Sequence, residues 1–193
     1  AKPIEICYCH TPPRYLYGYE TSIKPSWLIN FYATIVNPFM RYYDFVSAQK
    51  VDYFIANSKN VAKRINKFYR REAEIIYPPG DISFKFQISN LKSREYYLVV
   101  ARIVGAKGIE MANQAANKLG FKLKIAGEAV GYSSIIENLK RQARDNTEFL
   151  GYVNDQELVK LYKGAKAFLA LARDEDFGIT PVEAMQAGTP VIA

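Results

Sequence analysis

The second half of the chain alternates between short apolar runs and segments whose apolar residues recur at helical spacing. A continuous β-rich run such as YYLVVARI at 96–103 is typical of a strand buried on both faces. The pattern predicts strands at 96–103, 121–128, 147–153 and 165–172 and from 191 onwards, and helices at 109–119 and 134–144 and after Asn154 and Thr180. Such alternation with short connections predicts an α/β fold, in which helices cover both faces of a parallel sheet.

Two of these helix starts carry clear capping signals. Asn154 is a typical N-cap because its side-chain oxygen can accept from a backbone N–H of the first turn. Thr180 is followed by Pro181 and, three residues after Thr180, by Glu183. We therefore expect Thr180 to be the N-cap, Pro181 to lie in the first turn and Glu183 to complete a capping box.

The first half has a less regular pattern. Its apolar runs predict strands at 4–13, 51–57 and 73–79. They also predict a long helix at 26–49 that Pro38 breaks or kinks. A second helix, capped by Asn57 or Ser58, would bury Val61, Ile65 and Phe68. We expect one domain at 1–82, a linker at 83–94 and a second domain at 95–193. Only about three strands precede the linker and the chain stops within an apolar run, so we expect two partial domains from the middle of a larger protein.

Composition and the cysteine positions narrow the class of protein. Of the 193 residues, 49% are hydrophobic and 23% are charged, which is globular composition, and no apolar run is long enough to span a membrane. Cys7 and Cys9 would point to opposite faces of a strand, so no disulfide between them is expected. With no signal-peptide pattern at the start, we expect a reducing, cytoplasmic location.

The net positive charge is confined to the first half. Residues 1–94 carry 14 Lys and Arg against 7 Asp and Glu, and 10 of the 15 tyrosines, whereas residues 95–193 carry 12 of each charge. A basic, aromatic half suggests nucleic acid, an acidic membrane surface or a phosphorylated ligand as a partner. Composition alone favours the simpler explanation, a solvated surface with extra lysines.

The segment EDFGITPVE places two carboxylates around a predicted helix start. Glu175 follows a strand, Glu183 lies in the next helix, and the amides of Phe177, Gly178 and Ile179 would gather at the helix N-terminus. Unsatisfied N–H groups and the positive end of the helix dipole bind phosphate there. Taken singly, Glu183 is equally well explained as a capping residue.

Two cations follow the strand at 96–103. The sequence ARIVGAKG would deliver Arg102 to the carboxyl edge of the sheet, and its glycines would return Lys107 over the same edge. Two cations facing a helix N-terminus would form a diphosphate site, although each alone could be a solvated loop residue. Neither GxxxxGK[ST] nor GxGxxG is present, which disfavours a Walker loop and a nicotinamide dinucleotide.

His10 is the only histidine and follows the first predicted strand. A metal site with Cys7 and Cys9 is disfavoured because the spacing matches no usual zinc pattern. No GxSxG nucleophile motif is present either. His10 is therefore either a site histidine or a structural one.

The chain resembles the retaining glycosyltransferases of family 4, which have the two-domain GT-B fold. The likeness is carried by ANSKNVAKRI and IIYPPGD within 56–81, by VARIVGAKG at 100–108, by EFLGYV at 148–153, and above all by EDFGITPVEAMQAGTPVIA at 175–193. The last segment matches the E-x7-E motif of the family. CHTPPRYLY at 9–17 is most similar to mannosyltransferases of polysaccharide assembly.

The resemblance implies a nucleotide-diphosphate sugar donor, such as GDP-mannose, and a glycan or lipid-linked acceptor. It implies that Arg102 and Lys107 hold the diphosphate, that Glu183 binds the ribose and that Glu175 lies beside the transferred sugar. It further implies that the amides of Phe177, Gly178 and Ile179 contact sugar and phosphate, that Tyr152 and Val153 border the base, and that His10 reaches the sugar. Glu175 and His10 are thus the expected catalytic residues. No metal or other cofactor is expected, because cations of the chain would stabilise the leaving diphosphate.

Other functions remain open at this stage. A nucleotide-sugar epimerase, a glycoside hydrolase or an inactive nucleotide-binding fragment would share the fold. No nucleic-acid-binding signature is present, so nucleic acid is not an expected partner. The clusters at 41–43 and 63–71 combine cations with tyrosines, which suggests peripheral binding to an anionic membrane surface on the cytoplasmic side.

Overall fold

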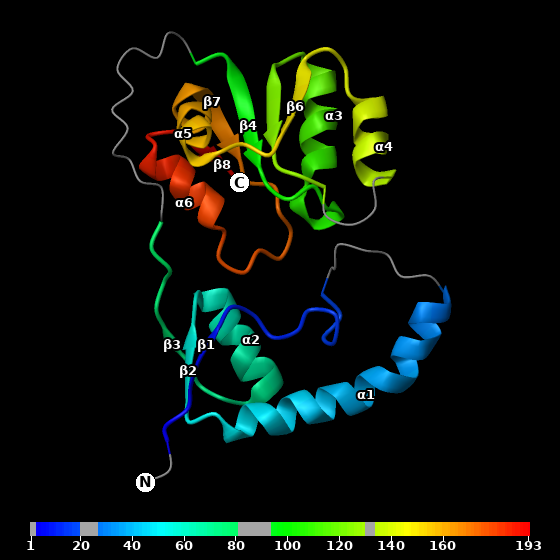
Figure 1. The fold of residues 1–193 in the computed structure, drawn as a ribbon, viewed down its shortest axis with the longest axis vertical. Coiled ribbons are helices and arrows are strands. Elements are labelled where there is room, and N and C mark those ends of the chain that lie inside the picture. Colours follow the sequence, from blue (N-terminus) through cyan, green and yellow to red (C-terminus); the bar gives the residue numbers. More distant parts are fainter. Residues whose placement is uncertain (1–2, 20–26, 81–93, 130–133) are drawn as a thin grey trace. The chain divides into compact units, whose positions relative to one another are not determined.

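A computed structural model describes residues 3–19, 27–80, 94–129 and 134–193 (Figure 1). Contacts between residues divide the chain into two units. The first comprises residues 1–79 together with 174–177, and the second comprises 80–173 together with 178–193. Of the linker expected at 83–94, only Arg94 is among the described residues, so the domain boundaries stay a prediction.

The second unit is built on a five-stranded parallel sheet. Its strand order is β6 (Thr147–Gly151), β5 (Leu123–Ala126), β4 (Tyr96–Val100), β7 (Ala165–Leu169) and β8 (Val191–Ile192). All four neighbouring pairs are parallel, which confirms the predicted α/β sheet. From β4 the chain proceeds outward to β5 and β6, and it then returns to the other side of β4 with β7, so strand order reverses between β4 and β7.

Helices cover both faces of this sheet (Figure 1). They are α3 (Ile109–Leu119), α4 (Ser134–Gln142), α5 (Asp155–Gly164) and α6 (Ile179–Gln186). Neighbouring residues of β4 point into different cores: Val99 packs in the cluster that includes residues of α3 and α4, and Leu98 packs with Tyr162 of α5 and Ala184 of α6. Because side chains alternate across a strand, one apolar strand serves both cores.

The two capping predictions had different outcomes. Asn154 is the N-cap of α5, and its side chain accepts from the backbone N–H of Glu157 at 3.0 Å, as predicted. The Thr180 cap is wrong, because α6 begins at Ile179 with Gly178 as its N-cap. Gly178 has a φ of 79°, a left-handed conformation that glycine adopts without strain, so the chain enters the helix two residues earlier. Glu183 consequently lies beyond the first turn and is not a capping-box residue.

The first unit holds a smaller parallel sheet. Its order is β1 (Ile6–Cys9), β2 (Tyr53–Ala56) and β3 (Glu74–Ile75), with α1 (Trp27–Lys50) before β2 and α2 (Lys59–Tyr69) before β3. Ser58 caps α2 by accepting from the backbone N–H of Val61 at 3.1 Å, as predicted. α2 buries Val61 and Ile65 against one face of the sheet, while Ile6 and Tyr53 on the other face are exposed among the described residues.

Helix α1 continues through Pro38, so of the two predicted outcomes, a break or a kink, the break does not occur. Of its residues only Ala48 is buried, and most of its large apolar side chains are exposed. Among the helices that the structure describes, none combines the length and apolarity needed to cross a lipid bilayer. Cys7 and Cys9 on β1 are both free thiols. The expectation that they point to opposite faces is wrong: both pack in the cluster that contains Val61 and Ile65, because residues two apart on a strand share a face.

We predict that Gly127→Ala destabilises the protein far more than Gly120→Ala. Both glycines have positive φ, at 135° and 73°, but a Cβ at Gly127 would lie 2.0 Å from the Ala101 carbonyl oxygen, whereas Gly120 faces open space. We expect roughly 1–2 kcal/mol from the conformation alone at Gly120. At Gly127 we expect about 3 kcal/mol or more, because the close contact adds to that cost. Urea denaturation measures both changes, and equal losses would contradict the close backbone approach.

Candidate functional site

The carboxyl edge of the second sheet gathers most of the predicted site residues. Arg102 lies two residues beyond β4 and is exposed. Lys107 is half-buried at the end of a short 3-10 helix, η1 (Gly105–Lys107). Ligands of parallel α/β sheets bind beyond the carboxyl ends of the strands where strand order reverses, and β4 borders that reversal.

Two contacts fix the η1 segment beside the residues that follow β7. The backbone N–H of Arg173 donates to the Ala106 carbonyl at 3.0 Å. Gly108 approaches Leu171 so closely that a Cβ would lie 2.2 Å from the Leu171 carbonyl oxygen. The ends of β4 and β7 are therefore tied together on either side of Lys107.

Helix α6 begins shortly after these residues. Gly178 is its N-cap and no side chain caps it, so the helix itself leaves the amides of Ile179 and Thr180 unsatisfied. Pro181, the third helical residue, has no N–H to contribute. The start of α6 therefore presents backbone donors and the positive end of the helix dipole.

Glu183 is held by a buried tyrosine. The Tyr162 hydroxyl, on α5, donates to Glu183 Oε2 at 2.9 Å, and the Tyr162 side chain is fully buried. Burial, reinforced by the neighbouring Glu183 carboxylate, raises the pKa of the Tyr162 phenol above its usual range. The phenol therefore stays protonated at neutral pH and remains a donor to Glu183, which is itself half-buried.

Tyr152 and Val153 follow β6 at the same edge. The Tyr152 side chain is 74% exposed and Val153 is half-buried. Their position is fixed by the neighbouring strand, because the Gly127 backbone N–H after β5 donates to the Gly151 carbonyl at 2.8 Å. The ends of β5 and β6 therefore place Tyr152 and Val153 at the same carboxyl edge of the sheet as Arg102 and Lys107.

The remaining predicted residues belong to the first unit. His10 follows β1, is exposed, and meets the Tyr8 ring edge-to-face with the ring centroids 5.3 Å apart. Glu175 and Phe177 lie in the 174–177 segment, which groups with this unit. Asn60 Nδ2 donates to the Glu175 carbonyl at 2.8 Å, and the Phe177 ring lies 5.9 Å from that of Tyr77.

The sequence did not predict the roles of several residues that contact the predicted site residues or lie next to them. Tyr162 was assigned only to an apolar helix face, and Gly127 was assigned to no role. Arg64 is buried on α2, at 3% exposure, and Tyr69 is buried too, so the expectation that the cluster at 63–71 faces a membrane surface is wrong for these two residues. The position of Arg64 three residues after Val61 was the available signal, since residues at that spacing share a helical face.

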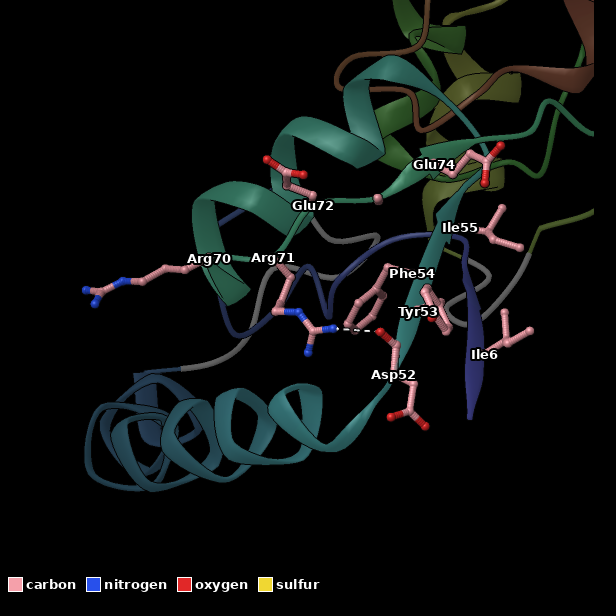
Figure 2. A pocket seen from close by; sticks show the side chains of 10 residues that line it. Ile6, Asp52, Tyr53, Phe54, Ile55, Arg70, Arg71, Glu72 and Glu74 are labelled. Atoms are coloured by element: carbon pink, nitrogen blue, oxygen red, sulfur yellow. Dashed lines mark hydrogen bonds between the residues drawn. The ribbon is translucent and has the colours of Figure 1, made fainter. Parts of the chain in front are cut away.

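Figure 2 shows a hollow in the first unit. It is lined by Ile6, by Asp52 to Ile55 and by Arg70 to Glu74, and the Arg71 guanidinium donates to the Asp52 carbonyl within it at 3.0 Å. These residues lie at the amino ends of β2 and β3. Because ligands of parallel sheets bind at the opposite ends of the strands, this hollow is not the candidate site.

Known proteins are similar to this chain in sequence. Residues 81–193 match the family described as "Glycosyl transferases group 1". An uncharacterised glycosyltransferase of Methanocaldococcus jannaschii is 38% identical over 117 residues, which are 58% of this chain and 30% of that protein. The O-antigen chain mannosyltransferase RfbU of Salmonella typhimurium is 27% identical over 154 residues, 76% of this chain and 43% of that protein.

Solved structures share the fold. Sucrose-phosphate synthase from Thermosynechococcus elongatus superposes with a TM-score of 0.68 at 22% identity, over 79% of this chain and 43% of that one. Structures of this kind confirm the expected GT-B type of α/β fold. The chain spans less than half the length of each of these relatives.

We predict that Tyr162→Phe costs more stability than Tyr96→Phe. The Tyr162 hydroxyl donates to a carboxylate, whereas the Tyr96 hydroxyl donates to the neutral Leu161 carbonyl, also at 2.9 Å. We expect a loss of about 1.5–3 kcal/mol for the first change and roughly 0.5–1.5 kcal/mol for the second. Urea unfolding at pH 7 measures both. A loss at Tyr162 no larger than that at Tyr96 would show that the bond to Glu183 is not formed in solution.

Proposed function

The chain belongs to the family of glycosyl transferases group 1. On that premise we propose that it transfers a hexose from a nucleotide-diphosphate sugar to a glycan or lipid-linked acceptor. The transfer would retain the configuration at the anomeric carbon. The observation that carries the proposal is the joining of the β4 and β7 ends around Lys107, next to the segment that leads into α6. This edge combines cations with a helix N-terminus at the reversal of strand order, which suits a diphosphate.

The proposed diphosphate ligands are Arg102 and Lys107. Breaking the bond between the anomeric carbon and the diphosphate places negative charge on the leaving group. The two side chains and the N-terminus of α6 would stabilise that charge, an effect typically worth 10²- to 10³-fold in rate per donor. The chain would thereby supply electrostatic stabilisation from its own residues.

The proposed nucleoside contacts lie on either side of this position. Glu183 would accept hydrogen bonds from the ribose hydroxyls, and Tyr162 would hold the Glu183 carboxylate in place. Tyr152 and Val153 would border the base. An acidic side chain suits a ribose with free hydroxyls, since each hydroxyl can donate to it.

The sugar contacts are proposed from the family resemblance. Glu175 would lie beside the transferred hexose, the amides of Phe177, Gly178 and Ile179 would contact sugar and phosphate, and His10 would reach the sugar. We assign the acceptor proton to the departing phosphate, which lies on the face that the acceptor attacks in retaining transfer. His10 and Glu175 then orient the sugar rather than accept that proton.

Mannose carried on a guanine nucleotide is our proposal for the donor. It is supported by CHTPPRYLY at 9–17 and by the similarity to the Salmonella mannosyltransferase. A thermal-shift panel of GDP-mannose, UDP-glucose, UDP-N-acetylglucosamine and their nucleoside diphosphates tests the proposal. GDP-mannose and GDP should raise the melting temperature most, and no response to any nucleotide would reject a donor site.

We predict that Arg102→Ala with Lys107→Ala weakens binding of the nucleoside diphosphate at least 100-fold, because two charge-assisted contacts to the diphosphate are lost. Binding of the bare nucleoside should change less than about threefold, since neither cation contacts it. The control is Lys140→Ala with Arg141→Ala, which removes the same charge from the last turn of α4. Isothermal titration measures all three proteins. Equal losses for diphosphate and nucleoside would show that Arg102 and Lys107 support the fold instead.

We propose peripheral binding to an anionic membrane surface as a second property, because α1 exposes many aromatic side chains. The most exposed aromatic residues of α1 are Trp27, Phe31, Tyr32, Phe39, Tyr42 and Tyr43, each at 66–76%. Aromatic rings of this kind suit the membrane interface. Phe68 does not contribute, because it stacks on Tyr17 with the ring centroids 3.9 Å apart.

We predict that the protein sediments with vesicles containing phosphatidylserine at low salt and is released at high salt, as screening weakens the attraction. Tyr42→Ser with Tyr43→Ser should weaken this binding. Tyr15→Ser with Tyr152→Ser, which removes two exposed tyrosines from loops, should leave it unchanged. A failure to bind phosphatidylserine vesicles at low salt would remove the membrane proposal and leave the transferase proposal intact.

A further inference from the structure

The segment 174–177 is bound along its backbone by side chains of the first unit. The Asp174 carbonyl accepts from the guanidinium groups of both Arg14 and Arg64, the latter at 3.0 Å. Four further bonds continue along the segment. Asn60 Nδ2 donates to the Glu175 carbonyl at 2.8 Å, the Ser58 hydroxyl donates to the Asp176 carbonyl, and both arginines donate to the Asp176 carboxylate. Three consecutive carbonyls therefore have side-chain donors.

The Asp176 carboxylate is the centre of this arrangement. Its Oδ1 accepts from Arg64 Nη1 and, at 3.2 Å, from Arg14 Nη2. The Arg64 side chain is only 4% exposed and that of Asp176 is 26% exposed, so the ion pair is shielded from water. A buried guanidinium needs a charged partner, because the cost of removing it from water is otherwise uncompensated.

Arg64 is itself fixed from other directions. Its Nη1 also donates to Thr11 Oγ1 at 3.0 Å, and its guanidinium lies over the Tyr19 ring, 4.3 Å from the centroid. It also lies on the buried face of α2, two turns from the Ser58 cap. A planar guanidinium with several fixed neighbours holds one orientation, which a flexible ammonium would not.

We infer that Arg64 and Arg14 are positioning residues, which act through Asp176 to hold the segment 174–177 and thereby the sugar-facing Glu175. The inference rests on the proposed function for the role of Glu175, but the binding of the segment rests on the contacts alone. Catalytic groups must be held within a fraction of an ångström, because small displacements lower the rate strongly. Arg64 and Arg14 would therefore affect catalysis while the diphosphate is held by Arg102 and Lys107.

The first test measures how firmly the segment is held. Chymotrypsin cleavage after Phe177 releases a peptide that begins at Gly178, and the rate at which this new N-terminus appears by mass spectrometry reports opening of the segment. Asp176→Asn removes the charge without changing the shape, and Arg64→Met removes the donors. Each rate is normalised to cleavage of the same variant in urea. The control is Arg71→Met, because Arg71 is also a half-buried arginine that donates to backbone carbonyls, at Ala48, Gln49 and Asp52, all outside the segment.

We expect Asp176→Asn and Arg64→Met to release the peptide at least about 10 times faster than the unchanged protein, since the open form becomes more populated. Arg71→Met should stay within about twofold of the unchanged protein, because its contacts lie elsewhere. Rates for Asp176→Asn and Arg64→Met no faster than that of Arg71→Met would overturn the inference. Asp176→Asn keeps this test decisive if Arg64→Met does not fold.

The second test separates positioning from folding. The assay measures hydrolysis of the nucleotide sugar selected by the thermal-shift panel, with water as the acceptor. Asp176→Asn should lower kcat of this reaction roughly 10- to 100-fold, as expected when Glu175 is misplaced. KM and the affinity for the nucleoside diphosphate should be unchanged, and Asp176→Glu should restore part of the activity by restoring the charge. An unchanged kcat despite faster cleavage would overturn the positioning role. If the unchanged protein binds and turns over no nucleotide sugar, the proposed function fails, and the proteolysis comparison alone decides whether the arginines hold the segment.

Discussion

The parallel hydrogen bonding of β4 to β5 on one side and to β7 on the other is the constraint on which the candidate site depends. Because β4 comes first along the chain but lies in the middle of the sheet, between β5 and β7, the chain leaves it toward one side and later returns to the other. The connections after β4 and β7 therefore start as neighbours and lead to helices on opposite faces, α3 and α6. Backbone donors and cations from distant parts of the sequence meet at that edge for this topological reason.

Close backbone contacts convert this topology into a defined geometry. Gly108 against Leu171 and Gly127 against Ala101 leave no room for a Cβ, so loops at the strand ends lie against one another directly. The backbone of such loops is therefore held in position by the sheet. This explains how the backbone at short connections, such as η1 with Lys107 and the residues that follow Gly151, is held beside the ends of the strands.

Much of this could be predicted from the sequence where local signals were strong. The apolar strand pattern and the Asn154 and Ser58 caps depend on nearest neighbours along the chain, and the structure confirms them. The start of α6 could not be placed correctly, because Thr180 offers a good cap and only the φ of Gly178 decides between two starts. The burial of Arg64 could not be predicted either, because its partner Asp176 lies 112 residues later in the chain. An ion pair between residues far apart in the chain produces no periodic pattern in the sequence.

The capping of α2 has a consequence for local stability. The Ser58 hydroxyl accepts from the Val61 backbone N–H and donates its own proton to the Asp176 carbonyl, so one oxygen atom serves the helix start and a segment more than a hundred residues away. Fraying of the first turn of α2 would turn this hydroxyl away and release the carbonyl at the same moment. Helix ends fray more readily than helix interiors, but here the fraying must also break a tertiary bond. The first turn of α2 and the segment 174–177 are thus expected to open together, as one cooperative unit.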